Sequence, residues 1–325
     1  GTTWNNRTSG TSNFLYGVTY GNSTFVAVGD NGTILTSTDN GTTWGSKTSG
    51  TTETLYGVTY DNSIFVVEGD NGTILTSSDG TTWTSRTSGT TEGLRGITYE
   101  NSTFVAVGES STILTSSDGT TWTSVSVGDS GNFWTSVTSP TSNHLEGVTF
   151  GNNTFVAVGS SGNIVRSTDN GSTFDNETSA TVYRLHGVTF GNNTFVGVGG
   201  GQNSETSYWD GTIVRSTDNG ASWENVSPSG ISNFLTGVTF GNNTFVGVTY
   251  GAWTIWRSTD NGASFSAVLE CNEFSNCYRS QIVHRLAAIT FGNNTFVAVG
   301  YDGSVGNEGV VIRSTDNGDT WDHVT

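Results

Sequence analysis

The sequence predicts an all-β fold, a seven-bladed β-propeller of four-stranded antiparallel blades. One pattern recurs seven times, at a spacing of about 40 residues where nothing is inserted, and this period is typical of propeller blades. Within each copy, short apolar runs alternate with Gly and Asn turns, which favours strands over helices. The copies open on Leu15, Leu55, Leu94, Leu145, Leu185, Leu235 and Leu286. They close on Trp44, Trp83, Trp122, Phe174, Trp223, Phe265 and Trp321.

The repeat predicts that residues 1–325 form one propeller domain. A circular array needs no polar capping repeats, and this sequence has none. The predicted repeats span 15–48, 55–87, 94–126, 145–178, 185–227, 235–268 and 286–325. Residues 1–8 contain the tail of another copy, Gly1-Thr2-Thr3-Trp4, and predict an extra outermost strand. With the strand that ends the seventh copy, this gives two candidates for one place in the ring, so one of them could pair with a neighbouring subunit.

Four strands fit each copy, and the first copy shows them in order. We expect strand a at 15–20, strand b at 25–29, strand c at 34–38 and strand d at 42–48. The a to b junctions are Gly-Asn-Asn or close variants, which tolerate the positive φ of a tight hairpin. Strand b is almost wholly apolar, as in Phe25-Val26-Ala27-Val28, which suits a sheet covered on both faces.

The turn between strands c and d carries the most specific motif, Ser-Thr-Asp-Asn-Gly-Thr-Thr-Trp at 37–44. Its Asp can accept backbone N–H groups across the turn, and its Gly supplies a positive φ. The motif resembles the Asp box of sialidases and other BNR-type propellers. Because it recurs almost unchanged, we interpret its carboxylates as structural rather than catalytic. These residues are Asp39, Asp79, Asp118, Asp169, Asp218, Asp260 and Asp316.

The fuller pattern, F-V-A-V-G-x-x-G-x-I-L-x-S-x-D-G-x-x-W, resembles two groups of propellers. One is the photosystem II stability and assembly factor type, and the other comprises propeller repeats of secreted bacterial and archaeal surface proteins. The first resemblance implies a protein-binding face, to which the recurring strand c arginines could contribute. Both resemblances imply the fold more strongly than any activity, because this fold carries unrelated functions.

Composition narrows the classes of partner. The formal net charge is -17 and Lys47 is the only lysine, so the chain repels nucleic acid and anionic lipid. No apolar run reaches the roughly 20 residues that a spanning helix needs. Cys271 and Cys277 suit a short disulfide loop formed in an oxidising compartment, with two free thiols as the alternative. Together with the abundance of Thr, Asn and Gly, these features predict an extracellular or cell-surface protein.

Insertions in the repeat predict where ligands bind. In a four-stranded blade, the b to c and d to a connections emerge on one side, which we call the top face. All the predicted insertions fall in these two kinds of connection, and they are 123–143, 199–211, 266–284 and 300–309. Aromatic and polar residues gather there, as is typical of a glycan- or protein-binding surface. Alternatively, the rings pack the long loops themselves. The candidate residues are Trp134, Tyr208, Trp209, Asp210, Trp253, Trp256, Tyr278 and Tyr301.

A second candidate cluster lies where the innermost strands begin. Arg184 and Arg285, with Arg95 and three histidines, could hold a carboxylate or sulfate, or could instead pair with acidic side chains, which we favour. The histidines occupy non-equivalent positions and lack ligand spacing such as H-x-x-x-H. We therefore predict no metal site and no cofactor; a bound cation has no support in the sequence.

The function predicted is an extracellular binding or adhesion module that recognises a glycan or a protein through its top face. A structural building block of an extracellular filament or surface layer is the alternative. A sialidase-like hydrolase ranks third, since the R-I-P motif of that family is absent and the repeat count is seven. Six sequons recur at the a to b turn and could carry glycans, although Asn and Thr also suit the hairpin itself. They begin at Asn22, Asn101, Asn152, Asn192, Asn242 and Asn293.

Overall fold

A computed structural model describes residues 9–39, 41–121, 139–202, 209–231, 233–250, 254–269, 284–292, 294–302 and 308–324. The chain divides into two compact units. We call one, which takes in 6–157 and 165–176, the N-terminal unit, and the other, which takes in 158–164 and 177–325, the C-terminal unit. Each unit is described by itself below.

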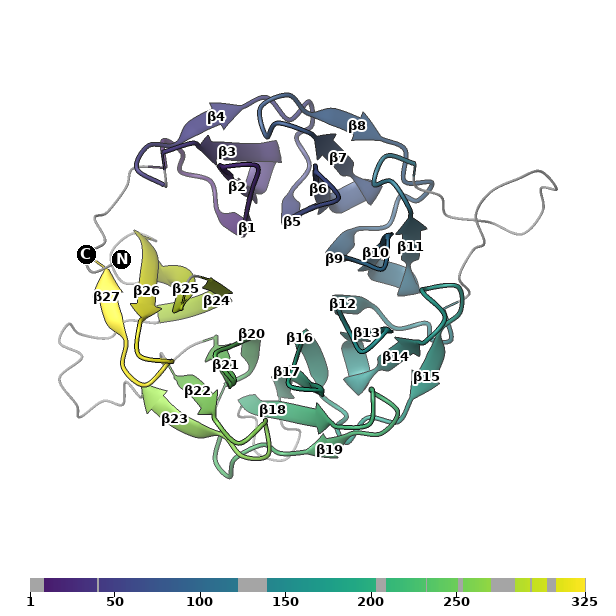
Figure 1. The fold of residues 1–325 in the computed structure, drawn as a ribbon, viewed down its shortest axis with the longest axis vertical. Helices are drawn as coiled ribbons and strands as arrows, with labels where there is room; N and C mark the ends of the chain where they lie inside the picture. The colour runs from purple at the N-terminus through teal and green to yellow at the C-terminus, as the bar shows by residue number, and fades with distance from the viewer. Residues whose placement is uncertain are drawn as a thin grey trace. The chain divides into compact units, whose positions relative to one another are not determined.

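The described residues form seven antiparallel sheets whose strands follow one another in chain order (Figure 1). Six sheets have four strands, and the third has three because its fourth strand, predicted within 94–126, falls outside the described residues. We number the sheets as blades 1 to 7 in chain order. The chain is a seven-bladed β-propeller, so the predicted fold class is confirmed.

Blades 1 to 4 contain the first fifteen strands and four short 3-10 turns. The strands are β1 (Leu15–Gly21), β2 (Thr24–Gly29), β3 (Thr33–Ser37), β4 (Gly45–Lys47), β5 (Leu55–Asp61), β6 (Ile64–Gly69), β7 (Ile74–Ser77), β8 (Thr84–Arg86), β9 (Leu94–Glu100), β10 (Thr103–Gly108), β11 (Ile113–Ser116), β12 (Leu145–Gly151), β13 (Thr154–Gly159), β14 (Ile164–Ser167) and β15 (Asp175–Glu177). The 3-10 turns are η1 (Asp30–Gly32), η2 (Asp70–Gly72), η3 (Glu109–Ser111) and η4 (Ser160–Gly162). They form the b to c connections of these blades.

Blades 5 to 7 contain the remaining twelve strands. They are β16 (Arg184–Gly191), β17 (Thr194–Gln202), β18 (Trp209–Ser216), β19 (Glu224–Asn225), β20 (Leu235–Gly241), β21 (Thr244–Thr249), β22 (Ile255–Ser258), β23 (Ser266–Leu269), β24 (His284–Gly292), β25 (Thr295–Asp302), β26 (Glu308–Ser314) and β27 (Asp322–Val324). The described parts of the predicted insertions, 199–202 and 209–211 in blade 5 and 300–302 and 308–309 in blade 7, are extended strands, because β17 and β18, like β25 and β26, pair beyond the length of the other hairpins.

The a to b hairpins confirm the turn chemistry expected from the sequence. In blade 4, Asn152 and Asn153 both have positive φ values, 47° and 57°, and blades 1, 2, 3, 5 and 6 use Asn-Ser or Asn-Asn pairs in the same way. Two consecutive residues with positive φ define the type I′ turn, whose twist matches that of the strands it joins. The register within each blade follows from these turns.

The core lies between neighbouring blades of the same unit. In the N-terminal unit, Val26, Val28 and Ile34 of blade 1 pack against Leu55 and other residues of blade 2. In the C-terminal unit, Val196, Val198 and Ile213 of blade 5 pack against Leu235 and other residues of blade 6. Alternate residues of strand b therefore face opposite neighbours, which explains why the sequence of strand b is almost continuously apolar.

The c to d turn is held by its Asp in all seven blades. In blade 5, Asp218 Oδ1 accepts from Ser216 Oγ at 2.8 Å and from the backbone N–H of Ser222 at 2.9 Å, while Oδ2 accepts from Ser222 Oγ at 2.6 Å. The Ser222 hydroxyl, followed by the Ser222 backbone N–H, lowers the pKa of Asp218 to about 2. Equivalent bonds form at the other six positions. Each carboxylate stabilises its own turn.

The strand c arginines join neighbouring blades. Arg215 Nε donates to the carbonyl oxygen of Asn261 in the next c to d turn at 2.9 Å, and Asn261 Nδ2 returns a bond to Thr194 Oγ1 at 2.7 Å. Arg257 makes the same bond to Asn317 at 2.8 Å. These arginines belong to the repeating framework, which agrees with their recurrence in the sequence.

Candidate functional site

The candidate site begins with three consecutive glycines in β17, Gly199 to Gly201. In blades 1 to 4, by contrast, strand b ends at a single glycine. A Cβ at Gly201 would lie 2.7 Å from Cδ1 of Tyr183, and one at Gly200 would lie 2.6 Å from Cβ of Phe234. Side chains essentially never approach a Cβ so closely. The glycines therefore allow aromatic residues from two d to a connections to lie directly over the strand.

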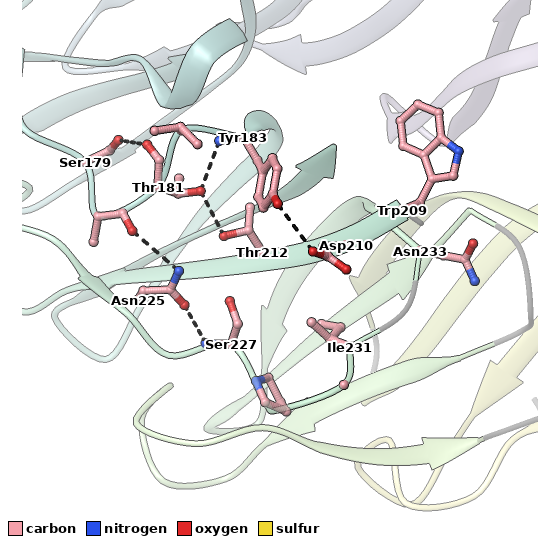
Figure 2. A pocket seen from close by; sticks show the side chains of 15 residues that line it. Ser179, Thr181, Tyr183, Trp209, Asp210, Thr212, Asn225, Ser227, Ile231 and Asn233 are labelled. Atoms are coloured by element: carbon pink, nitrogen blue, oxygen red, sulfur yellow. Dashed lines mark hydrogen bonds between the residues drawn. The ribbon is translucent and has the colours of Figure 1, made fainter. Parts of the chain in front are cut away.

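An open hollow of about 1040 Å³ lies beside β18 on the top face of blade 5. We call it the blade-5 hollow. The d to a connections at 179–183 and 225–233 line it, together with the first residues of β18 (Figure 2). Its described lining consists of Ser179, Ala180, Thr181, Val182, Tyr183, Trp209, Asp210, Gly211, Thr212, Asn225, Ser227, Pro228, Gly230, Ile231 and Asn233.

Hydrogen bonds fix both walls of the hollow. Gly211 N–H donates to the Ile231 carbonyl at 3.1 Å, and Asn233 N–H donates to the Trp209 carbonyl at 2.9 Å, so the second connection runs along the outer edge of β18. On the other wall, Thr181 and Thr212 hydroxyls lie 3.2 Å apart. The lining is thus built on a sheet, and most of its polar groups already have protein partners.

Tyr183 and Asp210 lie on the same side of the sheet and point toward one another (Figure 2). The Tyr183 hydroxyl donates to Asp210 Oδ2 at 3.3 Å. Among the described lining residues, Asp210 is the only charged one. Its half-buried carboxylate is therefore the main electrostatic feature of the hollow.

Trp209 stands at the rim and belongs to an aromatic cluster made of His186, Trp209, Phe234 and Tyr250. Its ring centroid lies 5.3 Å from that of Phe234, which stacks on Tyr250 at 4.7 Å and contacts His186 at 5.2 Å. Trp209 is nevertheless 49% exposed, and nearby Val182 is 82% exposed. The top face of blades 5 and 6 thus exposes apolar side chains beside a packed aromatic cluster.

The structure brings together only some of the residues predicted for ligand binding. Trp209 and Asp210 share the hollow, and Arg184 lies exposed at the start of β16. Trp256 does not join them, because it is 7% exposed and packs in the core between blades 5 and 6. Arg285 and Tyr301 are partners in the register of β24 and β25. Trp134, Tyr208, Trp253 and Tyr278, the Cys271 to Cys277 loop and Asn293 lie outside the described residues.

Sequence reasoning missed Tyr183, Phe234 and Ile231, which complete the hollow and its aromatic base. Each stands in a d to a connection of ordinary length, where nothing marks it as unusual. The signal that could have found them is the run of three glycines in strand b of blade 5, since such a run leaves room for side chains above the sheet.

One member of the cluster predicted where the innermost strands begin, Arg95, belongs to a network of internal pairs in the N-terminal unit. Arg95 forms ion pairs with Glu109 and, at 3.4 Å, with Asp70, and its guanidinium lies 4.0 Å from the Tyr56 ring centroid. The Tyr56 hydroxyl donates to Asp70 at 3.1 Å. For Arg95, the favoured alternative of pairing with acidic side chains is confirmed.

In the described residues, no group of three or more His, Cys, Asp or Glu side chains is arranged to hold a metal ion. In the same part of the chain, no helix is long and apolar enough to cross a membrane.

Comparisons with known proteins identify the fold. No protein-family model and no curated protein matches the sequence. Among solved structures, YCF48 from Cyanidioschyzon merolae has a TM-score of 0.61 at 16% identity, covering 89% of this chain and 93% of its own. YCF48 bound to D1 peptide has a TM-score of 0.65 at 16% identity, covering 93% of both chains. The computationally designed Ika8 protein has a TM-score of 0.65 at 12% identity, covering 96% of this chain and 86% of its own.

These similarities agree with the fold and with the resemblance to assembly-factor propellers noted from the sequence. At such low identity they describe the fold alone. The site must be argued from its own residues.

Proposed function

We propose that this chain is a binding module for a protein partner, which docks on the top face of blades 5 and 6. The observation that carries the proposal is the half-exposed ring of Trp209, held by Phe234 at the rim of the blade-5 hollow. Interface hot spots are enriched in Trp and Tyr side chains that sit beside pockets on a rigid base. One similar structure is that of YCF48 bound to D1 peptide.

The proposed activity is binding rather than catalysis. The seven turn carboxylates are engaged by their own turns, and Asp210 is paired with the Tyr183 hydroxyl. A hydrolase of the sialidase type would need an acid and a nucleophile placed together. Glu205 and Glu273, two further acidic residues of the predicted insertions, lie outside the described residues.

Further parts of the proposal rest on the sequence. The turn geometry supports assigning the repeated motif to the Asp-box class of BNR repeats. The single lysine, the sequons and the two cysteines support an extracellular or cell-surface location. A glycan is the second candidate ligand, favoured by the exposed Trp209 ring beside the polar Asn233 and Asp210, since sugar rings also stack on such surfaces.

Binding of the purified chain to an array of immobilised random-sequence peptides, and in parallel to a glycan array, tests the proposal. We expect a family of bound peptides whose signals fall about tenfold or more in Trp209→Ala. Tyr20→Ala is the matched control, because Tyr20 is 53% exposed, packs on Phe25 with centroids 4.5 Å apart, and is not among the lining residues of the hollow. Binding of glycans without peptides, or equal loss in both variants, would overturn the protein-binding proposal.

A further inference from the structure

Polar groups in the lining of the blade-5 hollow are already engaged within the protein. Thr181 Oγ1 accepts from the Tyr183 backbone N–H at 3.1 Å and from the Thr212 hydroxyl at 3.2 Å. The Asn225 side-chain oxygen accepts from the Ser227 N–H at 2.9 Å. A ligand rich in donors would give up its hydrogen bonds to water without finding enough open acceptors here. The hollow therefore favours a ligand that brings few donors of its own.

The d to a connection between blades 5 and 6 also occupies the outer edge of β18. Val226 N–H donates to the Ile213 carbonyl at 2.9 Å, and Ile213 N–H donates to Ser227 Oγ at 2.8 Å. Further along the same edge, Asn233 N–H donates to the Trp209 carbonyl at 2.9 Å. A partner strand adds to a sheet through open backbone groups at its edge. Strand addition does not suit this edge, so a ligand here must be recognised through side chains.

Apolar side chains and one amide remain open for such recognition. The Trp209 ring is 49% exposed, and Val182, which also lines the hollow, is 82% exposed. Asn233 lies at the same end of the hollow as Trp209 (Figure 2), and its side-chain amide forms no hydrogen bond with the described residues. The hollow thus offers an aromatic face beside a hydrogen-bond donor.

We propose that the blade-5 hollow binds a proline-rich segment of the protein partner in the polyproline II conformation, with proline rings on Trp209 and a carbonyl oxygen accepting from the Asn233 amide. Proline has no backbone N–H, so the segment brings acceptors but few donors. The polyproline II helix has no internal hydrogen bonds and is largely preformed, which reduces the entropy lost when it docks on aromatic rings. This inference rests on the proposed function and names the partner's chemistry.

The size and charge of the hollow agree with this ligand. Its volume of about 1040 Å³ lies at the upper end of the range for drug-sized ligands, roughly 300–1,000 Å³, so several residues can enter. The chain has a formal net charge of -17, which repels acidic segments but not uncharged ones. An amphipathic helix would need a continuous apolar groove, whereas Thr and Asn side chains interrupt the apolar lining here.

The test compares two dye-labelled ten-residue peptides, one of L-proline and one of D-proline, which have the same composition but form helices of opposite hand. Fluorescence anisotropy measures the dissociation constant of each peptide with the full chain. We expect the L-proline peptide to bind saturably and the D-proline peptide not to bind, because the carbonyls and rings of the mirror-image helix cannot meet Asn233 and Trp209 together.

Three variants locate the binding. Trp209→Ala should weaken binding of the L-proline peptide about tenfold or more. Asn233→Asp should weaken it about twofold to tenfold, because aspartate tolerates the φ of 69° at this position but has no amide donor. Tyr20→Ala is the matched control and should leave binding unchanged. Thermal melting confirms that each variant is folded.

The outcomes separate this inference from the proposed function. Equal binding of the two peptides, or unchanged binding in Trp209→Ala, would overturn the polyproline site, and unchanged binding in Asn233→Asp would overturn the role of that amide. If array peptides bind through Trp209 without enrichment in proline and the L-proline peptide does not bind, the inference fails and the protein-docking proposal stands. If neither the L-proline peptide nor any array peptide binds, both are overturned.

Discussion

Blade 2 and blade 5 are built from the same repeat but have different top faces. In blade 2, β6 ends at Gly69 and the tight η2 turn is pinned to its neighbouring connections by bonds from Asp70 N–H to Thr54 and from Gly72 N–H to Glu92. In blade 5, β17 continues to Gln202 and leaves the hollow beside β18. In these two blades, the short b to c hairpin is closed over by backbone bonds, whereas the long one lies beside a hollow.

The interiors of the two blades differ in polarity at one buried position of strand b, held by Glu68 in blade 2 and by Val198 in blade 5. Blade 5 has Val198, fully buried opposite Gly187, whereas blade 2 has Glu68, 1% exposed opposite Gly57. The Glu68 carboxylate fills the space over Gly57, and its Oε2 has no hydrogen-bond partner among the described residues. Burial raises the pKa of Glu68 to about 8. Blade 2 therefore contains a buried acid where its counterpart contains a valine.

The largest effect is expected from replacing Glu68. Because the pKa of Glu68 is raised from 4.5 to about 8, the folded state holds this proton more tightly than the unfolded state does. The resulting contribution to the free energy of unfolding is present in full below about pH 4.5 and is lost as the pH rises through 8. Glu68→Val should remove this loss, which amounts to at most about 5 kcal/mol of unfolding free energy. Urea unfolding near pH 5, 7 and 9 measures it.

The reciprocal variant, Val198→Glu in blade 5, sharpens the same comparison. It should lower the free energy of unfolding, and more so near pH 9 than near pH 5, because a buried carboxyl is tolerated best when protonated. An unchanged pH dependence in Glu68→Val would show that the buried acid does not control the stability of blade 2.

The second prediction separates the framework of blade 5 from its open surface. Trp223 is 9% exposed and its indole N–H donates to Gly220 at 3.0 Å, so Trp223→Ala should cost about 3–5 kcal/mol of unfolding free energy. Trp209→Ala should cost about 1 kcal/mol or less, since it loses mainly one aromatic contact. Chemical denaturation of both variants provides the measurement, and similar losses would contradict the division between the two tryptophans.

A smaller effect than that of Trp223→Ala concerns the turn that both blades share. Asp79→Asn and Asp218→Asn each remove a charged acceptor from backbone and hydroxyl donors, and each should cost about 1–2 kcal/mol. For Asp218, the lowered pKa places the loss of this contribution below about pH 4, as the carboxylate takes up a proton. Denaturation near pH 7 and pH 2 tests this, and clearly unequal losses in the two blades would show that the turns are not equivalent.

Much of the fold could be predicted because its causes are local. The Asn residues with positive φ, the Asp that accepts bonds within its own turn and the apolar strand b all lie within a few residues of the groups they contact. The seven copies repeat these signals, so the strand bounds in blade 1 differ from the prediction by only a few residues at each end.

The candidate site was predicted less completely because it depends on contacts between distant segments. Trp209 and Asp210 were found through an insertion, but the strand periodicity of Trp256 was overlooked, and its ring is buried between blades. Tyr183 and Phe234 reach β17 and β18 from two different connections, over glycines that make room for them. No local pattern distinguishes such residues from ordinary turn residues.

The sequence by itself determined the number of repeats, the strand order, the hairpin geometry and the structural role of the turn carboxylates. Only the tertiary structure decided which aromatic rings are buried, that Arg95 is held between Asp70 and Glu109, and that Asp210 stands in a hollow. The physical reason is the separation along the chain of the residues that interact. Backbone dihedrals and turn hydrogen bonds are set by neighbours in the chain, whereas burial and charge pairing are set by neighbours in space.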